Sequence, residues 1–392
     1  MAKAPDLNIP TSTSIVDVSI INTEQTILGL HPGRFISPPI PGHDYLAAPI
    51  YSFLIKHPVL NRSLVFDLGL RKDIWNWPPV LVEEFKNANV NVIVPKHIRE
   101  ILDDNGVDTK SLEAVVWSHA HLDHTGDPTT FEPHTKLIVG PGVKDGIFPG
   151  YPANPKSRFL LEADYSGREV QELDFSNSTI KIGKFPALDY FGDGSFYFLN
   201  SPGHCIGHIC GLARVTSNPD SFILMGGDII HHGGELRPHH YHPLPDQITP
   251  HPFNPVSPTP CPGEIFEKVL RDGKEQPFYV PSGASPNGQP TVHENPQEAI
   301  ESIKKLQEVD AYDNILVVPA HEQYLLGVAD FFPKPANDFM KKGWVKKVRW
   351  GFLADFAKAV GYEGKVEAAG DYSALPPGEY ENKLKDVVIP KY

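Results

Sequence analysis

The sequence predicts a layered α/β domain that carries additional segments. Short runs rich in valine, isoleucine and phenylalanine alternate with stretches of helical periodicity, as expected for strands covered by helices on their outer sides. The length of 392 residues is long for one compact domain but fits one domain with insertions. The 40 prolines indicate long ordered loops in place of long helices.

The first half of the chain contains a predicted hairpin, followed by helices and buried strands. Asn61-Arg62 lies between two apolar runs and marks the turn of the hairpin. Apolar residues spaced three and four apart predict the helices, and continuous apolar runs predict the strands. In chain order, the elements are strands at 51–55 and 64–66, helices at 81–86 and 98–103, and strands at 114–117 and 136–139.

The second half repeats this alternation and adds two less regular segments. In chain order, the elements are strands at 180–182, 196–199 and 222–225, a helix at 296–309, a strand at 315–318 and one helix at 336–356. Residues 231–262 hold six histidines and nine prolines with little periodicity, so we expect a loop insertion that walls a pocket. The side chains expected in this wall are His239, His240, Tyr241, His242 and Phe253.

Charge and composition disfavour several classes of partner. The formal net charge of −13 disfavours nucleic acid, whose phosphates carry the same sign. No stretch reaches the ~18 apolar residues of a membrane span, and the N-terminus lacks the apolar run of a signal peptide. Three cysteines, an odd and low number, suit a reducing compartment. We therefore expect a soluble cytoplasmic protein with a small-molecule substrate, and a homodimer stays open.

The strongest chemical signal is the run SHAHLDH at residues 118–124, which directly follows a predicted strand. His119 and His121 are two residues apart, so at a strand end both point to one side and can bind one metal. Asp123 and His124 follow in a turn and can reach a second metal nearby. Imidazole and carboxylate ligands suit zinc, although manganese, iron or cobalt fits the same set.

This run resembles the H-x-H-x-D-H signature of the metallo-β-lactamase superfamily. SPGH at 201–204 resembles the motif whose histidine completes the first metal site, and GGD at 226–228 the motif whose aspartate bridges both metals. PAH at 319–321 resembles the motif whose histidine completes the second site, and Asp67 resembles an aspartate that supports a ligand. Each motif follows a predicted strand, in the family's order, and the resemblance spans about residues 45–325.

The resemblance implies an αββα four-layer sandwich with two divalent metal ions, zinc favoured, at the edge where the strands end. On this basis we divide the chain into an N-terminal extension, 1–44, a catalytic domain, 45–329, and a C-terminal extension, 330–392, packed on that domain. The catalytic domain carries an insertion at 231–295. The implied metal ligands are His119, His121, Asp123, His124, His204, Asp228 and His321.

Within the superfamily, SPGHCIGH at residues 201–208 resembles a run of N-acyl homoserine lactonases, and the chain looks like the filamentous-fungal members of that branch. His208, at the end of this run, is expected to bond the backbone. We expect a hydrolase that opens a small cyclic ester or amide (a lactone or lactam) by attack of metal-bound hydroxide. Hydrolysis of acyl thioesters is the alternative. A metal-binding protein without turnover is a third hypothesis, which seven intact ligands disfavour.

Departures from the lactonase pattern concern the substrate side of the site. His231 stands where quorum lactonases usually carry tyrosine, three residues after the bridging aspartate, and we predict that it donates a proton to the leaving atom. His231 and Asp123 are thus the predicted catalytic residues. Glu322 replaces an aspartate that often follows the last metal histidine, and 92 residues separate Asp228 from His321. These departures argue against homoserine lactones as the natural substrate.

Overall fold

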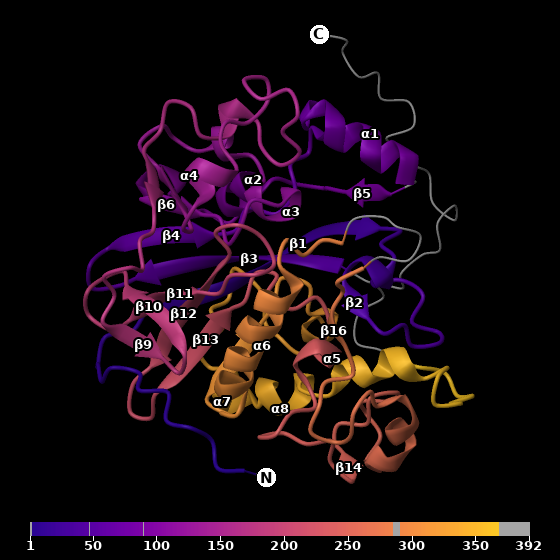
Figure 1. The fold of residues 1–392 in the computed structure, drawn as a ribbon. Coiled ribbons are helices and arrows are strands. Elements are labelled where there is room, and N and C mark those ends of the chain that lie inside the picture. Colours follow the sequence, from indigo (N-terminus) through magenta and orange to yellow (C-terminus); the bar gives the residue numbers. More distant parts are fainter. Residues whose placement is uncertain (1, 47, 89, 285–290, 368–392) are drawn as a thin grey trace.

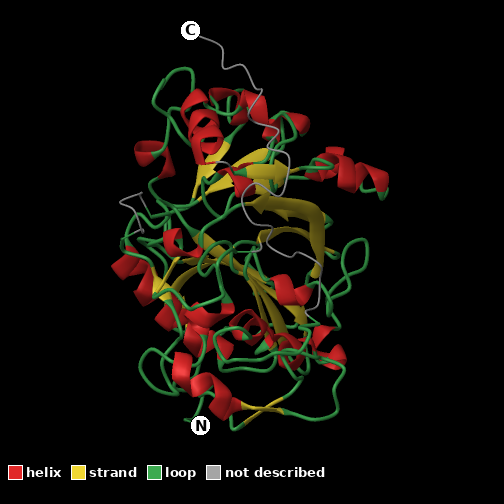
Figure 2. Ribbon diagram, turned by 90° about the vertical axis from the view of Figure 1, so that its right-hand side faces the viewer, coloured by secondary structure: helices red, strands yellow, loops and turns green. Residues whose placement is uncertain are grey.

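The computed structural model describes residues 2–46, 48–88, 90–284 and 291–367. Two main β-sheets pack face to face, and helices cover their outer sides (Figures 1 and 2). This arrangement confirms the layered α/β sandwich that the sequence predicts. Across the described ranges, no helix is both long enough and apolar enough to cross a membrane.

The first sheet is built from the N-terminal half of the chain. Its strands are β1 (Asp17–Leu28), β3 (Ala48–His57), β4 (Arg62–Phe66), β5 (Asn91–Ile93), β6 (Ala114–Val116), β7 (Lys136–Val139) and β8 (Val170–Glu172). They follow the order β5-β1-β3-β4-β6-β7-β8. The helices of this half are α1 (Pro79–Ala88), α2 (Ile98–Asp104), α3 (Leu122–Thr125) and α4 (Val143–Gly146). They lie above the first sheet in Figure 1.

The second sheet follows the order β17-β13-β12-β11-β10-β9. Its strands are β9 (Ile180–Ile182), β10 (Phe185–Asp189), β11 (Phe196–Asn200), β12 (Ile209–Thr216), β13 (Ser221–Met225) and β17 (Ile315–Val318). The helices of this half, in the lower part of Figure 1, are α5 (Gly233–Leu236), α6 (Pro296–Asp310), α7 (Phe339–Lys342) and α8 (Trp344–Val348). Two short ladders pair β2 (Ile36–Ser37) with β16 (Val280–Pro281), and β14 (Gln247–Ile248) with β15 (Cys261–Pro262).

Alternating apolar side chains explain why both faces of each sheet are covered. Phe53 of β3 and Phe66 of β4 belong to the core between the two sheets. Their neighbours Leu54 and Val65 belong to the outer core against α2, because successive side chains of a strand point to opposite faces. Each buried phenylalanine or leucine contributes about 1.5–3 kcal/mol when it leaves water. The outer face of the second sheet is covered by α6 in the same way.

Parallel strand pairs bring the predicted motifs to one edge of the sandwich. β4 pairs with β6 in parallel, and β13 pairs with β17 in parallel. The carboxyl ends of parallel neighbours lie at the same edge of a sheet. Asp67 follows β4, the run 118–124 follows β6, Asp228 follows β13 and His321 follows β17. Motifs that lie far apart in the sequence therefore meet at this edge.

Two elements differ from the sequence-based expectation. The predicted extension 1–44 contains β1, which pairs with β3 and β5 and is thus part of the first sheet. A register shift between Asn22 and Thr26 interrupts its alternation and obscures the strand in the sequence. The single helix predicted at 336–356 is divided, because Gly343 adopts a φ of 70° between α7 and α8 and the last part is a 3-10 helix. The predicted extension beyond residue 367 lies outside the described residues.

A buried ionic cluster joins the insertion to the C-terminal extension. Arg237 Nε donates to Asp310 Oδ2 at 2.8 Å, and Arg237 Nη2 donates to the other carboxylate oxygen. Arg237 Nη1 donates to the Arg349 carbonyl at 2.9 Å, and His239 Nε2 lies 3.0 Å from Asp310 Oδ2. Burial raises the pKa of Asp310, but Arg237 and His239 outweigh it and hold the pKa well below its usual range. The carboxylate is therefore charged and depends on its partners.

We expect Arg237→Met to lower the free energy of unfolding by about 3–5 kcal/mol, because it leaves the buried Asp310 carboxylate without its main partner. Urea unfolding followed by circular dichroism measures the loss. The folded-state pKa of Asp310 lies below the unfolded value of about 3.9, so the cluster's contribution is complete above that pH and is lost as the pH falls below it. Arg62→Met, which breaks a partly exposed pair with Glu113, is the matched control and should cost much less. Equal losses would contradict the special role of the cluster.

Candidate metal centre

Four of the predicted ligands surround one point at this edge. His204 Nε2 lies 2.9 Å from His121 Nδ1 and 3.2 Å from His119 Nε2. Asp228 Oδ2 lies 3.5 Å from the same His204 nitrogen. These four potential ligand atoms lie within 4.8 Å of one another. Three imidazole nitrogens and one carboxylate oxygen form a set that suits zinc.

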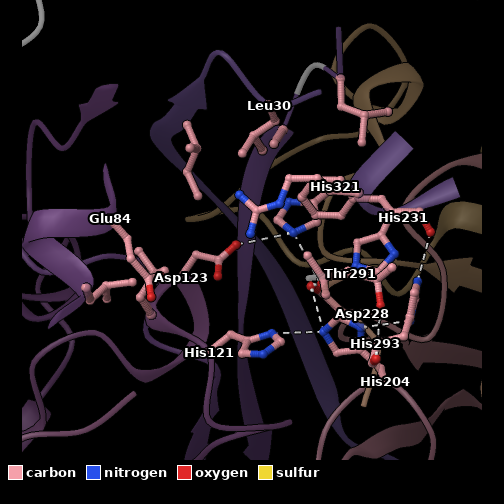
Figure 3. Close-up of a pocket in the computed structure, with 18 of the residues that line it drawn as sticks. Leu30, Glu84, His121, Asp123, His204, Asp228, His231, Thr291, His293 and His321 are labelled. Carbon is pink, nitrogen blue, oxygen red and sulfur yellow. Dashed lines mark hydrogen bonds and ion pairs between the residues drawn. The ribbon is translucent and has the colours of Figure 1, made fainter. Parts of the chain in front are cut away.

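A second group of four residues lies beside the first and shares Asp228 with it. Asp228 Oδ1 lies 3.1 Å from His124 Nε2 and 3.2 Å from His321 Nε2. Asp123 Oδ2 lies 3.3 Å from the same His321 nitrogen. Asp228 thus turns one oxygen toward each group, as a carboxylate shared between two ions does. The side chains of Asp123, His121, His204, Asp228 and His321 converge on one region in Figure 3.

The polar atoms of these groups fit a cation better than they fit one another. His124 Nε2 and Asp228 Oδ1 are buried and lie 3.1 Å apart, yet neither has a hydrogen-bond partner within the described residues. In the first group, the nitrogens of His119, His121 and His204 face one another. When their other nitrogens carry the protons, three lone pairs point at one spot. The residues present therefore fit a divalent ion at each group.

Hydrogen bonds behind the second group orient its histidines. His124 Nδ1 lies 2.8 Å from Asp67 Oδ2, and Asp67 Oδ1 accepts from the Ser118 backbone N at 2.7 Å. His321 Nδ1 donates to the Pro49 carbonyl at 2.8 Å. Such bonds hold the ring orientation and the tautomer of metal-binding histidines. Asp67 thus contacts the residue that the sequence predicted it to support.

His293 plays the same part for His204, and sequence reasoning missed it. His293 Nε2 donates to the Phe35 carbonyl at 2.9 Å, which leaves its Nδ1 as an acceptor 3.3 Å from His204 Nδ1. His204 then carries its proton on Nδ1 and presents the lone pair of Nε2 to the first group. His293 lies in the insertion 231–295, remote from every motif, and no local pattern distinguishes it from the other histidines there.

Burial and neighbouring charges set the protonation of the site. Burial lowers the pKa of His119 and of His204 well below the usual value, and neighbouring imidazoles lower it further. Burial raises the pKa of Asp228, but His124 and His321 hold it well below its usual range. The first group thus offers neutral imidazoles and an ionised carboxylate, the forms in which these side chains bind metals.

His208 confirms its predicted structural role. Its Nε2 accepts from the Asp228 backbone N at 3.0 Å, and its Nδ1 donates to the Ser201 carbonyl at 2.9 Å. The turn that carries Asp228 also requires Gly227, whose φ is 50°. A Cβ at this position would lie 2.8 Å from Ser118 Oγ and 2.9 Å from His208 Nε2. Close packing of the turn thus directs Asp228 toward both groups.

A cavity of about 660 Å³ opens onto both groups, and His231 lines it beside His293 (Figure 3). His231 Nε2 lies 3.3 Å from Asp228 Oδ2, and the His231 backbone N donates to Glu235 Oε2 at 2.6 Å. His231 thus lines the cavity with both ring nitrogens buried and without a hydrogen-bond partner of good geometry among the described residues.

The predicted pocket wall is wrong, because its residues are used elsewhere. Among the described residues, the cavity lining contains none of the five side chains between 239 and 253 that were expected there. His239 is buried against Asp310, and Phe253 stacks on Tyr362 of the C-terminal extension. The insertion instead supplies His231 and residues 291–294 to the cavity.

The chain is similar to curated fungal hydrolases over nearly its whole length. It is 43% identical over 397 residues to the γ-lactamase FDB1 of Fusarium pseudograminearum, covering 98% of this chain and 94% of that protein. It is 39% identical over 379 residues to the metallo-hydrolase mfmC of Annulohypoxylon moriforme, covering 95% and 96%. The chain belongs to the lactonase-like branch of the metallo-β-lactamase superfamily. It is a metal-dependent hydrolase.

Solved structures of the superfamily share the fold. The mutant AiiA of B. thuringiensis with bound N-decanoyl-L-homoserine matches with a TM-score of 0.53 at 16% identity, over 82% of this chain and 99% of that one. This likeness shows the sandwich fold. No protein-family model matches the chain.

We expect Asp67→Asn to lower metal affinity about 10–100-fold. Both oxygens of Asp67 accept hydrogen bonds, from His124 and from Ser118, and the NH₂ group of asparagine would replace one of these acceptors with a donor. Asparagine is the suitable substitution, since residue 67 has a φ of 60° and asparagine tolerates this region better than alanine does. Titration of the apoprotein with zinc against a chelating indicator measures the affinity. Asp104→Asn, at an exposed surface pair with Lys96, is the control. An unchanged affinity in Asp67→Asn would rule out the supporting role.

Proposed function

We propose that the chain opens a small cyclic ester or amide, a lactone or lactam, with two divalent metal ions, zinc being the favoured metal. This proposal rests on the position of Asp228, because its two carboxylate oxygens face two separate groups of ligand atoms. The proposed ligands are His119, His121, Asp123, His124, His204, Asp228 and His321.

The relatives support this substrate class. FDB1 is a γ-lactamase, and one solved neighbour is an N-acyl homoserine lactone hydrolase with the product N-hexanoyl-L-homoserine at its catalytic metal center. Lactams and lactones pose the same chemical problem: a ring carbonyl must accept a nucleophile, and the leaving nitrogen or oxygen must accept a proton. These relatives favour a cyclic ester or amide over the thioester alternative.

The chain's residues prepare the site for this chemistry. Divalent ions bound there supply Lewis acidity, which polarises a carbonyl and lowers the pKa of water. Asp228 belongs to both groups of ligand atoms, and the neutral His119, His121 and His204 add no charge to the first group. Apolar side chains, including Leu81 and Phe159, line the cavity and limit bulk water. Electrostatic interactions inside are stronger as a result.

His231 is the residue proposed to handle the leaving-group proton. It lines the cavity, lies 3.3 Å from the shared carboxylate, and is held by the bond from its backbone N to Glu235. The edge of the Phe35 ring packs against it at a centroid distance of 5.0 Å. A fixed histidine beside the reacting carbonyl can donate to the nitrogen or oxygen that departs.

We expect two metal ions per chain in protein purified without chelators. Metal analysis by mass spectrometry, with activity followed during chelation and zinc addition, measures this. Asp228→Asn should weaken both sites and abolish turnover, because it removes the charge that both share. The exposed Asp104→Asn controls for the general effect of losing a carboxylate. One tightly bound ion, with no gain in activity on adding metal, would contradict the two-ion site.

We expect His231→Ala to lower kcat about 10²–10⁴-fold with the metal content unchanged, because a general acid is lost. Alkyl lactams, whose leaving nitrogen needs a proton, should suffer more than activated aryl esters. Steady-state kinetics on both classes, with metal analysis of the same samples, give the comparison. Loss of a metal ion, or an equal small loss on both classes, would assign His231 a structural role instead.

A further inference from the structure

The cavity above the candidate metal centre is much larger than a small ring. Its volume of about 660 Å³ falls in the ~300–1,000 Å³ range of pockets for drug-sized ligands. One wall is apolar and is formed by Ile27, Leu30, Leu46, Leu81, Phe85 and Phe159. A substrate that fills this space needs a sizeable substituent beside its ring, and the polar residues of the cavity indicate its nature.

Arg34 is held in the lining of this cavity by its backbone. The Arg34 carbonyl accepts from the Val292 backbone N at 3.1 Å, and the next carbonyl, of Phe35, accepts from His293 Nε2 at 2.9 Å. Residues 292–294 also bond to the loop of the first group, because the Glu294 backbone N donates to the His204 carbonyl at 3.0 Å. This segment therefore connects the backbone of Arg34 to the backbone of a proposed metal ligand.

The guanidinium of Arg34 is partly buried and forms no hydrogen bond or ion pair with the described residues, although the charges of Glu84 and Arg158 act on it. Its Nε is buried without a hydrogen-bond partner, and no carboxylate of the described chain lies within ion-pair distance of the guanidinium. A buried cation is costly unless an anion or strong acceptors compensate it. The fold keeps Arg34 in the cavity in spite of this cost.

The other charged residues of the described lining each have a polar partner. Arg158 Nη2 donates to Glu84 Oε2 at 2.5 Å, so these two residues neutralise each other. Glu294 accepts from the Ile206 backbone N at 2.8 Å. Asp123 and Asp228 face the histidines of the two groups. Arg34 is therefore the arginine of the described lining that forms no ion pair with a carboxylate, and its guanidinium is available to a ligand.

We propose that Arg34 binds a carboxylate on the substituent of the substrate, so that the substrates are lactones or lactams that also carry an apolar group and a carboxylate. This inference rests on the proposed function. The planar guanidinium presents parallel N–H donors that match the two oxygens of a carboxylate. A single unmatched cation beside an apolar wall suits a monoanion better than a dianionic phosphate.

The test compares two lactones of equal size, a γ-butyrolactone with a 4-carboxyphenyl group and its 4-carbamoylphenyl counterpart. The holoenzyme should prefer the carboxylate in kcat/KM by at least about 10-fold. Arg34→Gln should lower kcat/KM for the carboxylate about 10–100-fold, mainly through KM, and leave the carboxamide within about 3-fold. Arg34→Lys should keep part of the preference, because it retains the charge but not the paired donors.

Arg271→Gln makes the same change of charge on an exposed loop outside the described lining and is the matched control. A wild-type enzyme that prefers the carboxamide would overturn the proposal. So would an Arg34→Gln variant that loses equally on both lactones, because Arg34 would then be a structural residue.

A binding experiment separates this proposal from the proposed function. Calorimetry with 4-cyclopentylbenzoate and 4-cyclopentylbenzamide, which contain no lactone or lactam ring, reports recognition without ring opening. We expect the benzoate to bind more tightly to the wild-type holoenzyme and this advantage to vanish in Arg34→Gln. If that result appears while no lactone or lactam is hydrolysed, the carboxylate site stands and the proposed reaction fails. If Arg34→Gln binds the benzoate as tightly as the wild type, the carboxylate site is wrong.

Discussion

The site depends on one buried, charged carboxylate, Asp228. An ionised carboxylate in this position is tolerated because His124 and His321 compensate its charge. The turn that carries it has room for no side chain at Gly227, and His208 holds the backbone N of Asp228 in place. The parallel pairing of β13 with β17 then sets His321 opposite the same carboxylate. Charge compensation and close packing at this point thus determine how the two groups of ligand atoms meet.

The insertion and the N-terminal segment both contribute to the lining of the cavity. Residues 291–294 bond both to the segment of Arg34 and to the loop of His204, so the cavity lining is tied to the metal centre. The rest of the insertion packs into the core and onto the C-terminal extension, where Arg237 meets Asp310 and the Arg349 carbonyl. A long insertion held by a buried ionic cluster can support a rigid cavity wall. Rigid support of this kind keeps binding groups at a defined distance from the reacting centre.

Much of the fold and of the site could be predicted from local patterns. The H-x-H-x-D-H run follows β6 and ends within α3, and His204, Asp228 and His321 each follow an apolar strand. β1 escaped prediction because a register shift breaks its alternation, and the helix at 336–356 was predicted too long because Gly343 interrupts it with a positive φ. In both cases a single local deviation outweighed a correct overall pattern.

The sequence alone thus indicated the layered α/β class, because strand periodicity is a property of neighbouring residues. Its resemblance to the metallo-β-lactamase superfamily pointed to the seven side chains that the structure brings together at the strand ends. Only the tertiary structure decided which of the many histidines outside the motifs reach the site. His293 supports His204, whereas His239 contacts Asp310, although both histidines lie in the same irregular insertion. The structure also placed Arg34 in the cavity, through bonds to a segment more than 250 residues away in the chain. Contacts of this range depend on the path of the whole chain, and no local spacing encodes them.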